Sequence, residues 1–172
     1  SNFMKVPDLE QLVKFTSTDL SDISLAVSNA HKKDVIDNAR GPKRKFKELS
    51  RRKTIEHNGE MISYREYKSR VFNNDQPNLF ASGDMFKTFK PQGKPKVDTE
   101  FSVKYGITDA KQAEKMNRHL TGVPDRLPKR AISLPDKPLP DPAIKVLLNG
   151  IANVIQKNFK KIANLDVQIV RI

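Results

Sequence analysis

The sequence has no cysteine, and its seven glycines are scattered through 172 residues. The lack of cysteine excludes disulfides and thiolate metal sites, and it leaves the redox compartment undetermined. Scattered glycines form no loop of the kind that cradles a nucleotide phosphate. No apolar run approaches the ~18 residues of a transmembrane helix, and residues 1–15 do not resemble a secretory signal. We therefore expect a soluble protein with no membrane among its partners.

Residue patterns that carry out catalysis are also missing. The three histidines are His31, His57 and His119, and none is spaced with another ligand residue as in a helical metal site. Ser82 lies in the sequence ASGD, which lacks the glycines of a nucleophile elbow. Asp98 and Glu100 come nearest to a magnesium-binding pair, but pairing with lysines across a sheet is the simpler interpretation. We predict a non-enzymatic protein with no catalytic, cofactor-binding or metal-binding residues.

Acidic residues are few for a chain this rich in charge. Lysine and arginine outnumber aspartate and glutamate by 32 to 20, which gives a net charge of +12 at pH 7. This excess favours an acidic partner, which can be nucleic acid, an anionic membrane or an acidic protein surface, and charge alone does not choose among them.

The strongest run of positive charge is residues 40–53, where eight lysines and arginines face the single acid Glu48. It is either a solvated surface or an arm that docks on an acidic ring or on phosphate, anchored by Phe46, Leu49 and Ile55. Two further arginines lie in other polar segments. The predicted contacts with a neighbouring subunit or an acidic partner are Lys43, Arg44, Lys45, Arg51, Arg52, Lys53, Arg65 and Arg126.

Apolar residues recur at helical spacing in four segments. A helix over 19–38 is expected to begin after Thr18 as its N-cap, and the strongest helix, over 141–163, begins with Asp141 and Pro142 and ends near Asn164. Shorter helices are expected over 8–15 and 108–120.

Strands are expected in three places. Asn58-Gly59 suits the tight turn of a small hairpin. Strict alternation predicts one strand over 97–105, which Gly106 ends, and residues 165–172 read as a final strand. Six prolines between Val123 and Pro142 exclude helix there. The sequence thus predicts one α+β domain over 1–172. Its small antiparallel sheet packs with the long C-terminal and the N-terminal helix, and it carries a basic arm and hairpin over 40–78 and a proline-rich arm over 121–142.

The order of short motifs resembles the phage virion-morphogenesis, or tail-completion, family. An amphipathic helix over 19–38 is followed by the basic patch KELSRRKTI at 47–55 and by the Ser-Gly signature LFASGDMF at 79–86. A strand, a short helix and a glycine come next, then Pro124-Asp125-Arg126-Leu127-Pro128, and finally the long helix. The resemblance covers roughly 19–163, and its specificity lies in the order of the motifs.

This resemblance implies a structural subunit of the virion neck or tail, which completes the tail or joins it to the head. The expected partners are copies of the chain in a ring, with six the expected number, and neighbouring connector, tail-tube or tail-terminator proteins. DNA in the channel is a possible passive contact. The protein would reside in the virion, after assembly in the host cytoplasm.

An alternative interpretation is a basic nucleic-acid-binding protein, similar to ribosomal or nucleoid proteins. Its support is the net charge and the two tyrosines, Tyr64 and Tyr67, that lie among basic residues and could stack on bases. The alternative structural interpretation is that these tyrosines anchor a loop on the core. A basic toxin or regulator has less support, because no recognition-helix pattern is evident.

Overall fold

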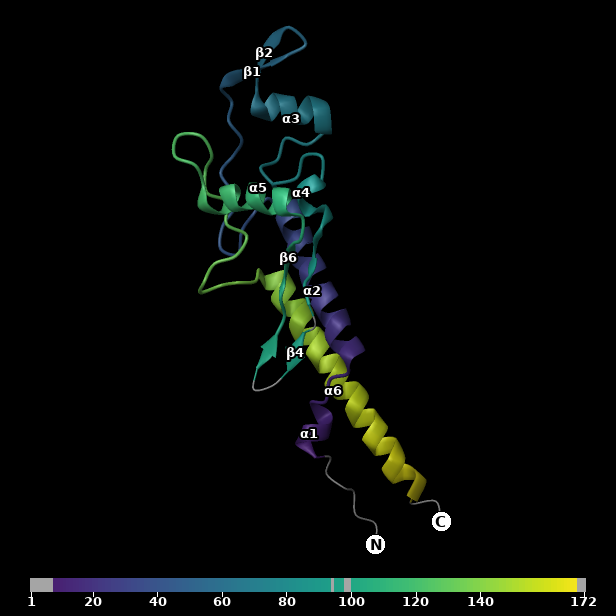
Figure 1. Ribbon diagram of the computed structural model, residues 1–172. Coiled ribbons are helices and arrows are strands. Elements are labelled where there is room, and N and C mark those ends of the chain that lie inside the picture. The colour runs from purple at the N-terminus through teal and green to yellow at the C-terminus, as the bar shows by residue number, and fades with distance from the viewer. Residues whose placement is uncertain (1–7, 94, 98–99, 170–172) are drawn as a thin grey trace.

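The computed structural model describes residues 8–93, 95–97 and 100–169, the last seven of these by their helical backbone alone. The protein is elongated, and its body is an antiparallel pair of helices, α2 (Ser17–Asn38) and α6 (Asp141–Ile169) (Figure 1). The short helix α1 (Leu9–Leu12) lies against α6, whose Asn158 side chain donates hydrogen bonds of 2.9 Å to the carbonyls of Leu12 and Lys14.

Helix α2 begins with a capping box. The Asp19 N–H donates to the Thr16 hydroxyl and the Thr16 N–H donates to the Asp19 carboxylate, each over 3.0 Å. The predicted helix is confirmed, with its N-cap at Thr16 in place of Thr18. Ala39 ends it in the left-handed region, at φ 48°, and donates its N–H to the Val35 carbonyl.

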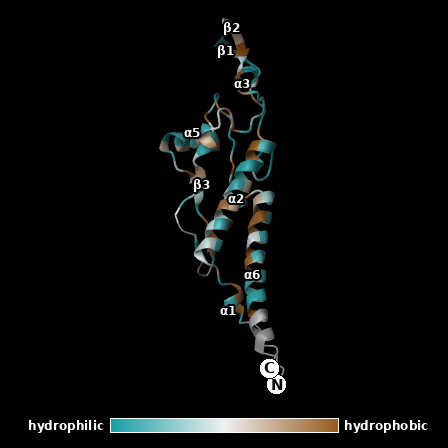
Figure 2. Ribbon diagram, turned by 90° about the vertical axis from the view of Figure 1, so that its right-hand side faces the viewer, coloured by the Kyte–Doolittle hydropathy of each residue, from teal (hydrophilic) through white to brown (hydrophobic). Residues whose placement is uncertain are grey.

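Two apolar clusters hold the molecule together. Helices α2 and α6 lie side by side (Figure 2), and the cluster between them contains Ile23, Val27, Ala143 and Val154. Gly150 lets the helices approach closely, since a Cβ there would lie 2.9 Å from Cγ1 of Ile23. The second cluster joins the far end of α2 to several later segments, and its buried members are Val35, Phe46, Met85, Phe86, Phe89, Met116 and Ile132.

The two predicted arms pack on the protein's own body. Phe46 and Leu49 of the basic segment are buried, as their apolar character predicts, and Ile132 of the proline-rich segment lies in the second cluster. His31 fixes the proline-rich segment to α2, because its Nε2 lies 2.6 Å from the Ile132 carbonyl. Its Nδ1 lies 2.7 Å from the hydroxyl of Tyr105, so the imidazole is held on both sides.

The α+β class is confirmed, but the strands form three separate antiparallel pairs among the described residues and not one sheet. The pair β1 (Lys53–His57) and β2 (Glu60–Ser63) is the predicted hairpin, with Asn58 and Gly59 at φ 52° and 77° in its turn. It projects at one end of the molecule, next to α3 (Tyr64–Phe72) (Figure 1).

The prediction of one strand over 97–105 is wrong. The chain reverses there, and β4 (Lys96–Val97) pairs with β5 (Phe101–Ser102), so that Val97 lies opposite Phe101. The same long hairpin continues in β3 (Phe89–Pro91) and β6 (Tyr105–Ile107), and Gly106 lies inside β6. The alternation of apolar residues hides the reversal, because neither glycine nor proline lies between Val97 and Phe101.

Helix α4 (Asp84–Lys87) follows Gly83, and α5 (Ala110–Thr121) begins at the N-cap Asp109 and ends at Gly122, which confirms the predicted short helix within two residues. The predicted final strand and the cap at Asn164 are wrong, because α6 continues to Ile169. Ile162, Leu165 and Ile169 recur at helical spacing, which explains the continuation. Residues 170–172 of that predicted strand lie outside the described part.

Candidate functional site: two interaction surfaces

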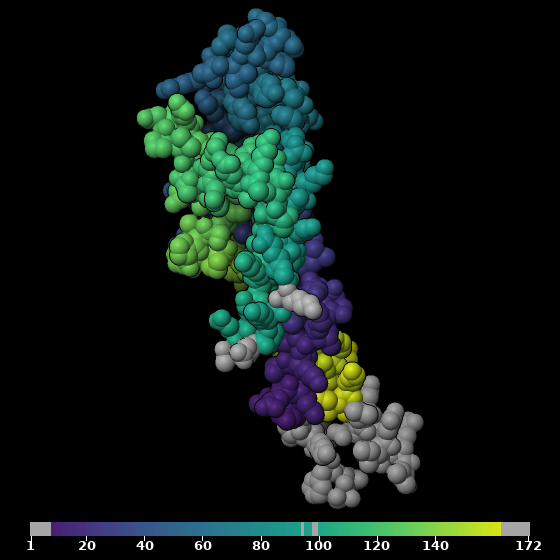
Figure 3. Space-filling view, viewed as in Figure 1, coloured from purple at the N-terminus to yellow at the C-terminus, as the bar shows by residue number. Residues whose placement is uncertain are grey.

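An open cavity of about 1170 Å³ lies where the basic segment, α3, α4, α5 and the proline-rich segment meet. Figure 3 shows these parts gathered at one end of the molecule, the 40–80 segment in blue and α5 with the following residues in green. We name it the junction cavity. Its lining comprises residues 47–50, 52, 54, 64, 68, 77, 79–85, 115, 119 and 121–130.

Local sequence signals explain how the walls form. Ser63 and Glu66 make a capping box that begins α3, with the Glu66 N–H donating to the Ser63 hydroxyl over 3.2 Å. Gly122, at φ 75°, turns the chain out of α5, and the main chain of Val123 and Leu127 then forms a tight bridge of 2.8 Å hydrogen bonds. The N–H of Arg130 donates to the His119 carbonyl over 2.7 Å, which closes the loop against α5.

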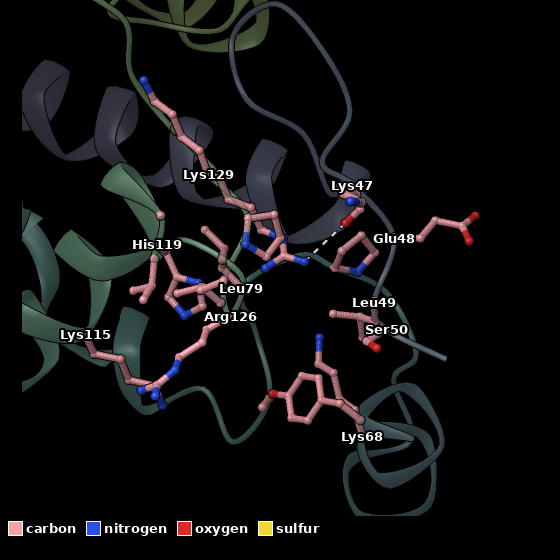
Figure 4. A pocket seen from close by; sticks show the side chains of 18 of the residues that line it. Lys47, Glu48, Leu49, Ser50, Lys68, Leu79, Lys115, His119, Arg126 and Lys129 are labelled. Atoms are coloured by element: carbon pink, nitrogen blue, oxygen red, sulfur yellow. Dashed lines mark hydrogen bonds between the residues drawn. The ribbon is translucent and has the colours of Figure 1, made fainter. Parts of the chain in front are cut away.

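The junction cavity is strongly cationic. Seven lysines and arginines line it against three acids, Glu48, Asp84 and Asp125. Figure 4 shows Lys68, Lys115, His119 and Arg126 around the cavity. Such an arrangement favours the binding of an anion.

Two of these cations are buried, which is unusual for lysine and arginine. Lys68 is 2% exposed, and its Nζ donates to the Gln76 carbonyl and, over 2.9 Å, to Oδ1 of Asn78. Arg130 is 5% exposed, and its Nη2 donates to the Lys47 carbonyl over 3.2 Å. The Nε of Arg130 is buried without a hydrogen-bond partner among the described residues.

Burial changes the protonation of the groups around Arg130. It lowers the pKa of Lys68 to about 8 and the pKa of His119 to about 4, and in both cases the positive charge of Arg130 adds to the effect. Burial raises the pKa of the Tyr64 hydroxyl. His119 is therefore neutral at pH 7, and its Nδ1 is also buried without a partner in the described structure.

The predicted contact residues do not form one site. Arg52 and Arg126 line the junction cavity. Lys43 pairs with Asp136, Arg65 pairs with Asp75 over 2.8 Å, and Arg51 lies 3.5 Å from Glu48. The remaining predicted residues, Arg44, Lys45 and Lys53, are exposed and form no ion pair with a described residue.

Sequence reasoning missed Lys68, His119 and Arg130. The Ser-x-x-Glu pattern at 63–66 predicts a helix start, so it could have placed Lys68 on a helix. No sequence signal marks Arg130, because its burial depends on the packing of the proline-rich segment against α5 and the basic segment.

The second surface is an apolar stripe along α6. Ile144, Leu148, Ile151, Ile155, Phe159 and Ile162 follow one another at spacings of three or four residues. At 100° per residue they fall within a sector of about 80°, roughly 100° around the helix from the face that packs on α2. Leu148 is 59% exposed and Phe159 is 49% exposed, and the four isoleucines are half-buried. We name these six residues the α6 stripe.

No protein-family model, curated protein or solved structure matches the chain. No helix in the described part of the chain is both long and apolar enough to cross a bilayer. Within the same residues, no three histidine, aspartate or glutamate side chains are grouped so that they could hold a metal ion.

Proposed function

We propose that the protein is a structural subunit of a phage neck or tail, which assembles into a homo-oligomeric ring through the α6 stripe. The observation that carries the proposal is that α6 is apolar on two faces and only one of them is buried against α2. An amphipathic helix in a monomer needs one apolar face, so a second face along the same helix suits a second helix.

The motif order supports placing this subunit in a virion. The resemblance to tail-completion proteins includes the basic patch, the Ser-Gly signature and the long C-terminal helix, and α6 is the element that bears the stripe. The basic and proline-rich segments pack on their own body. The proposal therefore assigns the main subunit contact to α6, while the projecting β1–β2 hairpin and the exposed cations can reach the next ring.

The test is the oligomeric state of the purified protein across a concentration series, by mass photometry and negative-stain imaging. The wild-type chain is expected to form closed rings, and a mass near six subunits is expected from the resemblance. Leu148→Glu places a charge at the most exposed large apolar residue of the stripe and should reduce the rings to monomers while the circular dichroism stays unchanged.

The matched control is Val71→Glu, which introduces the same charge at another exposed apolar residue, on α3 at the opposite end of the molecule. It should assemble as the wild type does. A wild-type protein that stays monomeric at every concentration, or a Leu148→Glu protein that still forms rings, would contradict the proposal. Phage particles made without the protein should be filled heads without attached tails.

A second candidate function is nucleic-acid binding, favoured by the exposed cations Arg44, Lys45, Arg52 and Lys53, which form no ion pair in the described structure. This function predicts that the logarithm of the affinity for duplex DNA falls steeply and linearly with the logarithm of the salt concentration. Lys53→Gln should then reduce the slope by about one. Binding without a steep salt dependence would remove this candidate.

A further inference from the structure

The junction cavity holds two buried cations whose charge no described acid neutralises. Asp75 already forms an ion pair with Arg65, with Oδ2 of Asp75 2.8 Å from Nη2 of Arg65. Glu48 is exposed at the rim, Asp84 accepts a hydrogen bond from the neighbouring serine hydroxyl over 2.9 Å, and Asp125 is exposed on its turn. A buried cation without an anionic partner is unfavourable. Lys68 and Arg130 therefore stay charged at a cost to stability, and an anionic ligand would remove that cost.

The guanidinium of Arg130 has an unused edge. Its Nε–H is buried and has no hydrogen-bond partner among the described residues. Nη2 carries two hydrogens and donates one hydrogen bond, to the Lys47 carbonyl. Nε and Nη2 together form the fork that binds the two oxygens of a carboxylate. Lys68 supplies a third donor group from α3, because its Nζ carries three hydrogens and makes two hydrogen bonds to neutral acceptors.

We propose that the junction cavity binds a carboxylate side chain of an acidic peptide segment from a partner protein, with Arg130 and Lys68 as the residues that receive it. This inference does not depend on ring formation through the α6 stripe. Lys68 and Arg130 are buried but line the open cavity, so a carboxylate at the tip of an aspartate or glutamate side chain can approach them from it, whereas a nucleic-acid phosphate is attached on both sides to sugars.

The cavity walls favour a peptide over other sources of negative charge. The half-buried apolar side chains of Leu79, Phe80 and Val123 line the same cavity as the cations. They can take up the apolar neighbours of an acidic residue, while a free oxyanion would leave them in contact with water. A volume of about 1170 Å³ accommodates several residues of an extended chain. The exposed Arg126 and Lys115 at the cavity extend the attraction to a second acid on the segment.

The probe is a fluorescent ten-residue peptide of alternating leucine and glutamate, titrated with the full chain at pH 7 and near-physiological salt. A peptide with glutamine in place of glutamate tests the need for the carboxylate. A ten-nucleotide oligothymidylate and inorganic phosphate test the other anions. The glutamate peptide should bind, and fluorescence anisotropy should show neither the glutamine peptide nor the oligonucleotide binding with comparable affinity.

Two variants locate the binding. Arg130→Met should lower the affinity for the glutamate peptide by about tenfold or more, because the two charge-assisted hydrogen bonds from the guanidinium are lost. Lys160→Gln, which removes an exposed cation from α6, should change the affinity less than about twofold. Equal binding of the glutamine peptide, preferential binding of the oligonucleotide, or an unchanged affinity in Arg130→Met would overturn the proposal.

A measurement on the wild-type chain decides the case if Arg130→Met does not fold. The lysine ¹³Cε resonances report the titration of Lys68, whose pKa of about 8 results from burial and from Arg130, with Asp75 acting in the opposite direction. A bound carboxylate should raise this midpoint by about one unit or more. A midpoint that does not move when the glutamate peptide is added would overturn the proposal on its own.

Discussion

The two ends of this molecule differ in what they leave unsatisfied. The helical body formed by α2 and α6 has more apolar surface than one chain buries, and the excess lies along the α6 stripe. The end built from α3, α5 and the two irregular segments has more buried positive charge than its own acids neutralise. The first imbalance suits a contact between like surfaces, and the second suits an acidic ligand.

The largest expected change in stability distinguishes a residue of the apolar core from a residue of the α6 stripe. Phe86→Ala removes a ring that is buried in the second cluster and should lower the free energy of unfolding by about 4 kcal/mol. Phe159→Ala is the same chemical change on the α6 stripe and should alter the stability of the monomer by less than about 0.5 kcal/mol. Urea denaturation at low protein concentration measures both.

The comparison fails if Phe159→Ala destabilises the monomer as strongly as Phe86→Ala does. In that case the stripe would belong to the core of a single chain, and the ring interface would have to lie elsewhere. A loss of rings without a loss of monomer stability is the expected result for Phe159→Ala.

A second prediction tests whether the irregular segments belong to the folded body. Gly41 of the basic segment lies so close to the proline-rich segment that a Cβ would stand 2.3 Å from the Ala131 carbonyl oxygen. Gly41→Ala should therefore cost about 3 kcal/mol of stability, since main-chain atoms must move. Gly106→Ala is the control, because its nearest contact would be an ordinary 3.6 Å from Nε2 of Gln92.

The unfolding temperatures of Gly41→Ala and Gly106→Ala show whether the two irregular segments pack on one another in solution. If Gly41→Ala is as stable as Gly106→Ala, the two segments do not pack on one another in solution, and they regain the role of free arms that their composition predicts. A large difference places them in the body of the subunit.

Sequence patterns predicted the parts of this fold that local signals define. Helices α2 and α6 and the Asn58-Gly59 turn were expected from periodicity, capping and turn residues, and all three are present. The strands over 97–105 and 165–172 were wrong, because alternation alone marks neither a chain reversal nor the end of a helix. Seven of the eight predicted contact residues are exposed cations and Arg65 is half-buried, whereas the two that define the junction cavity, Lys68 and Arg130, are buried by packing between distant segments.

The third prediction concerns pH and the charged end. The pKa of His119 is lowered to about 4 by burial and by the positive charges of Arg130 and Lys115, while in the unfolded chain it is near 6.5. The unfolded chain thus binds the proton more readily, so stability is fully present above pH 6.5 and is lost as the pH falls toward 4. The loss should be about 2 kcal/mol, less than the full shift implies because the side chain is partly exposed.

Unfolding temperatures measured between pH 7 and pH 4 check this prediction, with His119→Gln as the comparison. The variant should lose less stability over that range than the wild type. His31, whose pKa burial also lowers, contributes in the same direction and remains in both proteins. Identical pH profiles would show that His119 is not desolvated in the folded protein.

The smallest expected change in stability is a gain, whereas Phe86→Ala and Gly41→Ala are expected to lose stability. Arg130→Met should raise the free energy of unfolding of the unliganded protein by about 1 kcal/mol, because an apolar side chain of similar length replaces a buried charge without an acidic partner. The Lys47 carbonyl loses its 3.2 Å hydrogen bond, but it lies at an open cavity that water can enter. Urea denaturation measures the gain.

The matched control for Arg130→Met is Arg126→Met, which changes an exposed cation of the same cavity and should leave the stability within about 0.5 kcal/mol. A gain in stability at Arg130, combined with weaker binding of the acidic peptide, would identify a residue that is kept for a ligand at the expense of the free fold. A loss of several kcal/mol would instead mean that the guanidinium already has its partners within the chain.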